Sequence, residues 1–337
     1  MDLKHFELRL DLFESPSLRD NPAGDPAERR IPVVLPRSCS REAARRYPVV
    51  FVLAGFAGSG QSFLNWKSWA PTLPEQIDRL REEGKIGDVI AVFPDAFTVY
   101  GGSQYLNSAA TGRYEDMVVQ DLVGWVDSRY PTLAAARHRA IAGKSSGGYG
   151  ALVLGMRHPD VFSAVVCHSG DMYFEYCYAI DFPRLLSQLE KHGGLEAFLD
   201  AFFKAPKKTS DLVLAMNIVA MAAAYSPAPE KPWRIELPFD LRTGEIIEPV
   251  WRRWLEHDPV RLCGRYADNL RSLRLLFLDC GSRDQFHLQY GLRILSQRFK
   301  DLGVTHVCEE FDDDHTDISY RYDVSLPRIW QAVRPEG

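Results

Sequence analysis

A serine set between closely spaced glycines, near the middle of the chain, has the spacing of a catalytic nucleophile. Residues 143–147 read Gly-Lys-Ser-Ser-Gly; a short apolar run precedes them and a helix-compatible stretch follows. Such a strand–turn–helix, a nucleophile elbow, holds the serine on a strained backbone with its hydroxyl above the sheet edge. A side chain at Gly143 or Gly147 would collide with the facing turn, and glycine removes the collision. The Ser146 N–H then points from the helix start at a bound carbonyl.

Other glycine-rich patterns resemble this stretch in part. A phosphate-binding loop, Gly-x-x-x-x-Gly-Lys-Ser/Thr, would need its first glycine at position 138, which is His138. A serine protease built on a β-barrel also surrounds its serine with glycines, but no helix pattern would follow directly. A chance occurrence of Gly-x-Ser-x-Gly remains as the alternative, so the serine needs partners elsewhere in the chain.

A serine hydroxyl attacks a carbonyl at neutral pH only when an imidazole takes its proton and a carboxylate orients the imidazole. Elbow folds supply these groups in the order serine, acid, histidine. His315 lies just past the last expected strand, and Asp284 lies in the turn after an earlier one. Asp279 is the rival acid, but it belongs to a strand end and fits a structural role better. Residues 312–314, all aspartates, are too close to His315 to reach its ring from below.

A second oxyanion donor is expected from the glycine-rich loop 56–60, which follows the apolar run 47–55. Elbow folds take this donor from the loop at that position, and Phe56 is the best candidate. We also expect Gly55, Tyr105 and His168 to contact substrate, although the loop around Tyr105 could equally be a plain surface loop. No His-Glu-x-x-His or similar cluster indicates a metal site, and the chemistry calls for no cofactor.

Strands and helices alternate up to about residue 172, which predicts a largely parallel sheet covered on both faces. Apolar runs and alternation predict strands at 5–14, 31–35, 47–55, 88–95, 139–142, 163–170, 273–279 and 304–311. Amphipathic spacing and caps predict helices at 75–83, 114–130, 291–302 and 317–333.

The pattern changes over residues 173–269, where helical stripes appear and no strand is evident. The stretch 211–225 is apolar nearly all round except for Asn217. We therefore expect a core of residues 1–172 and 270–337 and a helical cap, residues 173–269, over the active-site mouth. A small helical subdomain packed to one side is the alternative.

Composition narrows the class of protein further. With 46% hydrophobic and 25% charged residues and a net charge of -5, the chain reads as globular and unsuited to nucleic acid or an anionic membrane. No segment approaches the roughly 18 unbroken apolar residues of a membrane span, and the first residues lack an apolar signal core. Six scattered cysteines without a Cys-x-x-Cys pair favour a reducing cytoplasm. A homodimer stays open.

Together these motifs resemble the esterase D-like branch of the α/β-hydrolase fold. Residues 143–151 are similar to its Gly-x-Ser-x-Gly-Gly-x-x-Ala signature, and residues 281–284 to its Gly-x-x-Asp acid turn. Residues 105–108 and 112–116 are similar to the segment before its elbow helix. The resemblance covers roughly residues 45–172 and 270–335. The branch includes S-formylglutathione hydrolases, feruloyl and acetyl-xylan esterases, enterochelin esterases and mycolyltransferases.

The resemblance implies a serine carboxylic ester hydrolase that acts on small-molecule acyl or aryl esters through an acyl-enzyme. The chain departs from the branch at Ser146, where methionine or leucine is common, at the aspartates before His315, and in its insert of nearly 100 residues. Two alternatives stay open: an acyltransferase that uses an alcohol acceptor, and a hydrolase-fold binding protein without catalysis.

Overall fold

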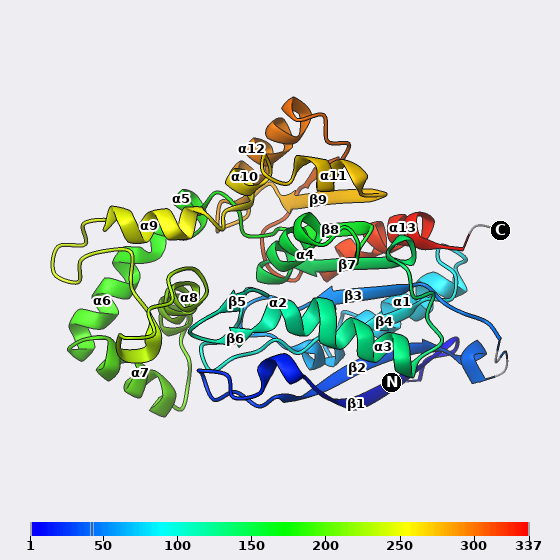
Figure 1. Cartoon of the computed structure of the whole chain (residues 1–337), viewed down its shortest axis with the longest axis horizontal. Coiled ribbons are helices and arrows are strands. Elements are labelled where there is room, and N and C mark those ends of the chain that lie inside the picture. Colours follow the sequence, from blue (N-terminus) through cyan, green and yellow to red (C-terminus); the bar gives the residue numbers. More distant parts are fainter. Residues whose placement is uncertain (1, 41, 43, 336–337) are drawn as a thin grey trace.

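A twisted sheet forms the centre of the molecule in the computed structural model, which describes residues 2–40, 42 and 44–335 (Figure 1). Within these residues the sheet has eight strands, in the spatial order β1 (Phe6–Glu14), β2 (Glu28–Pro36), β4 (Ile90–Val92), β3 (Val49–Leu53), β7 (Arg139–Lys144), β8 (Ala164–His168), β9 (Leu275–Gly281) and β10 (Val307–Phe311). The β1–β2 and β2–β4 pairs are antiparallel, and the pairs from β4 through β10 are parallel. The predicted mostly parallel α/β sheet is therefore confirmed.

The strand β3 shows why the middle of the sheet is stable. Its five residues, Val-Val-Phe-Val-Leu, are each 0% exposed, and the strand lies between β4 and β7. Val50 and Val52 face one helical layer, whereas Val49, Phe51 and Leu53 face the other. β-Branched and aromatic residues fit such a doubly covered strand, and each buried side chain of this size contributes about 1.5–3 kcal/mol.

Helices cover both faces of the sheet, as the alternating pattern predicted. One face carries α1 (Leu73–Glu82) and α13 (Tyr322–Val333); the other carries α3 (Val123–Arg129), α4 (Ser146–Arg157) and α12 (Leu288–Asp301). The expected helix 114–130 is continuous from α2 (Tyr114–Asp116) through the π-helical turn η4 (Met117–Leu122) into α3. A small hairpin, β5 (Asn107–Ser108) and β6 (Gly112–Arg113), precedes it.

Residues 173–269 are helical and add no strand to the central sheet. Their helices are α5 (Phe174–Cys177), α6 (Phe182–His192), α7 (Leu195–Lys204), α8 (Ser210–Tyr225), α9 (Glu248–Leu255), α10 (Pro259–Leu262) and α11 (Ala267–Ser272). In Figure 1, α6 to α9 gather at one end of the molecule, whereas α10 and α11 lie against α12 and α4. The helix α8 is buried from Ala215 onward except at Asn217, which explains its apolar character on nearly every side. In the described part of the chain, no helix has the length and apolarity needed to cross a membrane.

Candidate active site

The turn between β7 and α4 has the strained geometry that its glycines predict. Ser145 has φ 59° and ψ -129°, a conformation that residues with side chains rarely adopt. A Cβ on Gly143 would lie 2.2 Å from the Gly147 carbonyl oxygen, and a Cβ on Gly147 would lie 2.2 Å from that of Leu53. The strand therefore reverses into the helix only because both positions lack a side chain. The Ser145 N–H donates to the His168 carbonyl at 2.9 Å, which fixes the turn to β8.

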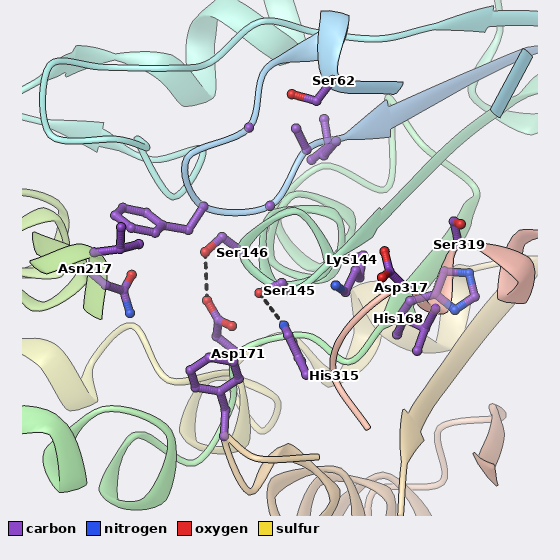
Figure 2. Close-up of a pocket in the computed structure, with 18 of the residues that line it drawn as sticks. Ser62, Lys144, Ser145, Ser146, His168, Asp171, Asn217, His315, Asp317 and Ser319 are labelled. Atoms are coloured by element: carbon purple, nitrogen blue, oxygen red, sulfur yellow. Dashed lines mark hydrogen bonds between the residues drawn. The ribbon is translucent and has the colours of Figure 1, made fainter. Parts of the chain in front are cut away.

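Three residues far apart in the sequence form one hydrogen-bonded chain. The Ser145 Oγ lies 2.9 Å from the Nε2 of His315 (Figure 2), and the Nδ1 of the same ring lies 2.7 Å from the Oδ2 of Asp284. The second carboxylate oxygen of Asp284 accepts the Phe286 N–H at 2.9 Å, and the Phe286 ring packs edge-on against the imidazole. A neutral imidazole held in this way keeps a proton on Nδ1 and a free lone pair on Nε2 for the hydroxyl.

A second chain with the same residue types lies behind the first. His168 is 2.7 Å from Asp279 through Nδ1 and 2.9 Å from the Ser325 Oγ through Nε2, while Arg321 donates to the other oxygen of Asp279. Ser325 is 0% exposed, and His168 and Asp279 are 1% exposed, so no substrate carbonyl can reach this hydroxyl. Ser325 differs from Ser145 because it is buried and lies within helix α13, although the hydroxyl-to-imidazole distances of the two chains are equal.

The loop after β3 contains Phe56, the residue expected to supply the second oxyanion amide. Ala57, with φ 60°, donates its N–H to the Gly101 carbonyl, and the Gly58 N–H donates to Gly55. Among the described residues, neither the Phe56 nor the Ser146 amide nitrogen hydrogen-bonds to another protein group. Both residues line the cavity that contains Ser145, as oxyanion donors must.

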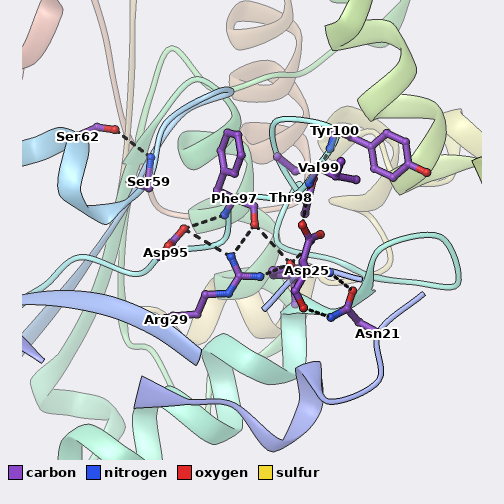
Figure 3. A network of polar contacts seen from close by, with 12 residues as sticks. Asn21, Asp25, Arg29, Ser59, Ser62, Asp95, Phe97, Thr98, Val99 and Tyr100 are labelled. Atoms are coloured by element: carbon purple, nitrogen blue, oxygen red, sulfur yellow. Dashed lines mark hydrogen bonds and ion pairs between the residues drawn. The ribbon is translucent and has the colours of Figure 1, made fainter. Parts of the chain in front are cut away.

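A buried polar network holds the neighbouring loop in place (Figure 3). Arg29 is 5% exposed and donates to the Phe97 carbonyl at 2.8 Å, with the Asp95 carboxylate 3.9 Å away. Asp25 accepts the Val99 N–H at 2.9 Å, so the segment 25–29 at the start of β2 holds the loop after β4 at two points. Because the Gly101 carbonyl of this loop accepts the Ala57 N–H, the network also fixes the loop 56–60 that follows β3.

The nucleophile opens into a cavity of about 450 Å³. Figure 2 shows polar side chains on both sides of Ser145: Ser146, Asp171 and Asn217 on one, and Lys144, Asp317 and Ser319 on the other. Apolar walls come from Phe56, Phe63, Val213, Leu214, Phe286 and Ile318. Since Val213, Leu214 and Asn217 belong to α8, the inserted helices form part of the cavity wall.

The other residues singled out from the sequence lie in different places. Gly55 lines the cavity, and a Cβ there would lie 3.4 Å from the Cβ of Ser145. His168 is on the cavity wall, but both of its ring nitrogens are engaged by Asp279 and Ser325. Tyr105 is not brought to the cavity; its hydroxyl donates to the Ala54 carbonyl at 2.7 Å behind the oxyanion loop.

The aspartates around His315 have partners of their own. Asp279 binds His168 and Arg321 rather than His315, in line with its expected structural role. Asp312 pairs with Arg283, Asp313 accepts the Tyr320 hydroxyl, and Asp314 accepts the Thr316 hydroxyl. None of the three aspartates hydrogen-bonds to the imidazole of His315 in the described structure.

Sequence reasoning missed several polar groups of the cavity, among them Lys144, Asp171 and Asp317. Asp171 lies three residues past the end of β8, at the carboxyl end of a parallel strand, and that position is a usable signal for a site residue. Burial lowers the pKa of the Lys144 ammonium, since its side chain extends from the end of β7 into the partly closed cavity. In the described ranges, no group of three or more His, Cys, Asp or Glu side chains is arranged to hold a metal ion.

Comparison with known proteins gives a consistent result. The family model described as "Putative esterase" matches residues 26–329. The esterase Rv1288 of Mycobacterium tuberculosis is 28% identical over 131 residues, 39% of this chain but only 26% of that protein, so the aligned stretch spans about a quarter of the relative.

Solved structures share the fold over nearly the whole chain. A ferulic acid esterase has a TM-score of 0.61 at 21% identity and covers 98% of this chain and 100% of its own. S-formylglutathione hydrolase FrmB of Staphylococcus aureus has a TM-score of 0.59 at 17% identity, with the same coverage of both chains. MPT51 (FbpC1) of M. tuberculosis has a TM-score of 0.57 at 14% identity and covers 97% of this chain and 99% of its own.

Proposed function

From the premise that this chain belongs to the esterase family, whose model spans most of its length, we propose that it is a serine carboxylic ester hydrolase. The observation that carries the proposal is the hydrogen-bonded chain from Ser145 through His315 to Asp284, with distances of 2.9 Å and 2.7 Å. The serine of this chain is the one that opens into the cavity between the core and α8.

The reaction follows from the positions of these groups. The Ser145 oxygen attacks the ester carbonyl while His315 Nε2 takes the hydroxyl proton, and the Asp284 carboxylate stabilises the resulting imidazolium. The negative charge on the carbonyl oxygen is met by the Phe56 and Ser146 amides, each worth about 3 kcal/mol in comparable sites. The imidazolium gives its proton to the departing alcohol, which leaves an acyl-enzyme. Water then attacks the acyl-enzyme with the same base and releases the acid.

The cavity walls favour an ester with some apolar bulk. Phe56, Val213, Leu214 and Phe286 present aliphatic and aromatic surface beside the nucleophile. The volume of about 450 Å³ is at the small end of ligand pockets, which suits a small-molecule ester. We propose that residues 173–269 act as a cap, because Val213, Leu214 and Asn217 of α8 supply part of the cavity wall.

The test is p-nitrophenyl acetate hydrolysis together with labelling by a fluorophosphonate. Ser145→Ala is expected to abolish turnover and to remove the covalent adduct that mass spectrometry finds on the wild-type peptide. Ser325→Ala is the matched control, since it removes the hydroxyl of the buried look-alike chain at the same histidine distance. It should keep both turnover and label. Turnover that survives Ser145→Ala would refute the assignment.

A further inference from the structure

A buried carboxylate beside the oxyanion hole lacks a cation. Asp171 follows β8 and is 7% exposed. Its Oδ2 accepts three hydrogen bonds from neutral donors: the Tyr178 hydroxyl at 2.8 Å, the Ser146 hydroxyl at 3.0 Å and the Gln104 amide at 3.1 Å. In the described part of the chain, no Lys, Arg or His nitrogen lies within 4.0 Å of this carboxylate, and no protein group donates to its Oδ1.

A carboxylate as buried as that of Asp171 is unusual without a cationic partner. A buried carboxylate normally has a cationic partner, because several kcal/mol of hydration are lost when it leaves water. Burial raises the pKa of Asp171, whereas the hydrogen bonds from Tyr178 and Gln104, the charge of His315 beyond contact distance and the Ser146 hydroxyl lower it. The buried Asp279 and Asp258 show the usual arrangement in this same protein, with Arg321 and Arg261 as partners.

The carboxylate lines the cavity that holds the nucleophile, so a ligand can reach it. Ser146, which donates to it, is the residue directly after Ser145, and Figure 2 shows this contact next to the catalytic hydroxyl. The Asn217 side chain extends from α8 into the same part of the cavity. Its amide hydrogen-bonds to no described residue, although it is the polar exception in an otherwise apolar helix.

The opposite side of the cavity contains positively charged side chains. Lys144 lies there, and Lys67 pairs with Asp317 at the rim. No described cation lies on the Asp171 side, where the remaining walls are Cys177, Val213 and Leu214. The side of the cavity next to α8 therefore offers hydrogen-bond acceptors and a carboxylate. Among the described residues, it lacks a cation that would balance that carboxylate.

We propose that the Asp171 carboxylate, with the Asn217 amide, forms a subsite for a protonated amine carried by one half of the ester substrate. The inference rests on the proposed ester hydrolase function and deepens it to aminoalkyl or aminoacyl esters. The ammonium donates to Asp171 Oδ1, a charge-assisted hydrogen bond in a site sheltered from water. The ester carbonyl then lies over Ser145, one residue from the Ser146 contact.

Two pairs of isosteric esters test the amine subsite and show whether it accepts an amine on the alcohol half or on the acyl half of the substrate. In the first pair, 2-(dimethylamino)ethyl butyrate and 3-methylbutyl butyrate, the charge is on the alcohol half. In the second, ethyl 4-(dimethylamino)butyrate and ethyl 5-methylhexanoate, it is on the acyl half. Acid release in a pH-stat at pH 7.5 gives kcat/KM for each. The cationic member is expected to be preferred at least tenfold in one pair.

Asp171→Asn keeps the size of the side chain and removes the charge, so the preference should fall to about one. Asp317→Asn is the matched control, an acid on the opposite side of the cavity, and it should keep the wild-type preference. Asn217→Leu should lower the preference at least threefold without disturbing the Ser146 contact. Circular dichroism and thermal unfolding confirm that each variant folds.

Binding measurements test the amine subsite independently of the proposed ester hydrolysis. Calorimetry of the same ester pairs with Ser145→Ala and with Ser145→Ala/Asp171→Asn reads the subsite without turnover. A preference of the single variant for a cationic ester, lost in the double variant, supports the subsite even if no ester is hydrolysed. Equal binding of both members of both pairs, or a preference that survives Asp171→Asn, overturns it.

Discussion

The replacement Gly147→Ala tests the link between the elbow and the oxyanion hole. The added Cβ would lie 2.2 Å from the Leu53 carbonyl oxygen, 2.7 Å from the Leu53 carbonyl carbon and 2.8 Å from the Ala54 oxygen. All three atoms belong to the backbone that leads to Phe56, so no side-chain rotation relieves the contact. A separation of 3.0 Å requires α4 and the end of β3 to part by about 0.8 Å.

That displacement determines the expected loss of unfolding free energy and the expected loss of kcat. Overpacking of a close-packed interior costs about 1–3 kcal/mol of unfolding free energy. Because Phe56 and Ser146 are carried on the two segments that separate, the oxyanion donors move apart by a similar distance. A misplacement of about 1 Å lowers kcat on the order of 100-fold. The expected result is a folded protein with a large loss in kcat.

Urea unfolding and p-nitrophenyl ester turnover measure the two effects separately. Gly124→Ala is the matched control: Gly124 lies exposed in α3, and a Cβ there meets no atom within 4 Å. It should leave kcat unchanged and raise the unfolding free energy by about 0.5–1 kcal/mol. If Gly147→Ala keeps wild-type kcat and stability, the reasoning about the close contact is wrong.

Three further outcomes are expected. Asp284→Asn should keep the fold and lower kcat by about 10⁴, since the imidazole loses its orienting charge; a loss below tenfold would exclude this role. Tyr105→Phe should lower the unfolding free energy by about 1–3 kcal/mol, because the Ala54 carbonyl loses its donor; unchanged urea midpoints would contradict this. Burial lowers the pKa of His257 from 6.5 to about 4. As the pH falls from 6.5 to 4, the unfolded chain therefore binds the proton before the folded protein does, and the free energy of unfolding drops by about 3 kcal/mol. His257→Phe keeps the stack on Tyr225 and should lose less stability between pH 7 and 4.5.

The parts of the molecule that were predictable are those set by local constraints. The glycines at 143 and 147 have one plausible purpose in that spacing, and Ser145 adopts the strained conformation they predict. Apolar runs such as 47–55 mark buried strands whatever surrounds them, and β3 lies within that run. Chain order then selected His315 and Asp284, which the structure brings into one hydrogen-bonded chain with Ser145.

What was not predictable depends on distant segments. Asp171 takes its hydrogen bonds from Gln104, Ser146 and Tyr178, which belong to three different segments, and no periodicity in the sequence joins them. Tyr105 lies in a loop that the sequence predicts to line the cleft, yet its backbone has φ 56° and its hydroxyl donates to the Ala54 carbonyl instead. The direction of Asn217 likewise depends on how α8 packs, because a helix that is apolar all round has no face that its sequence alone can orient.

The side chain of Ser146 joins two parts of the molecule that would otherwise be independent. Its amide is one of the two proposed oxyanion donors, while its hydroxyl donates to the Asp171 carboxylate, which also accepts the hydroxyl of Tyr178 in the inserted segment. A sequence change among the inserted helices is therefore transmitted to the atom that bears the developing charge. We therefore expect substitutions near Tyr178 that alter substrate choice to alter the turnover rate as well, through the position of Ser146.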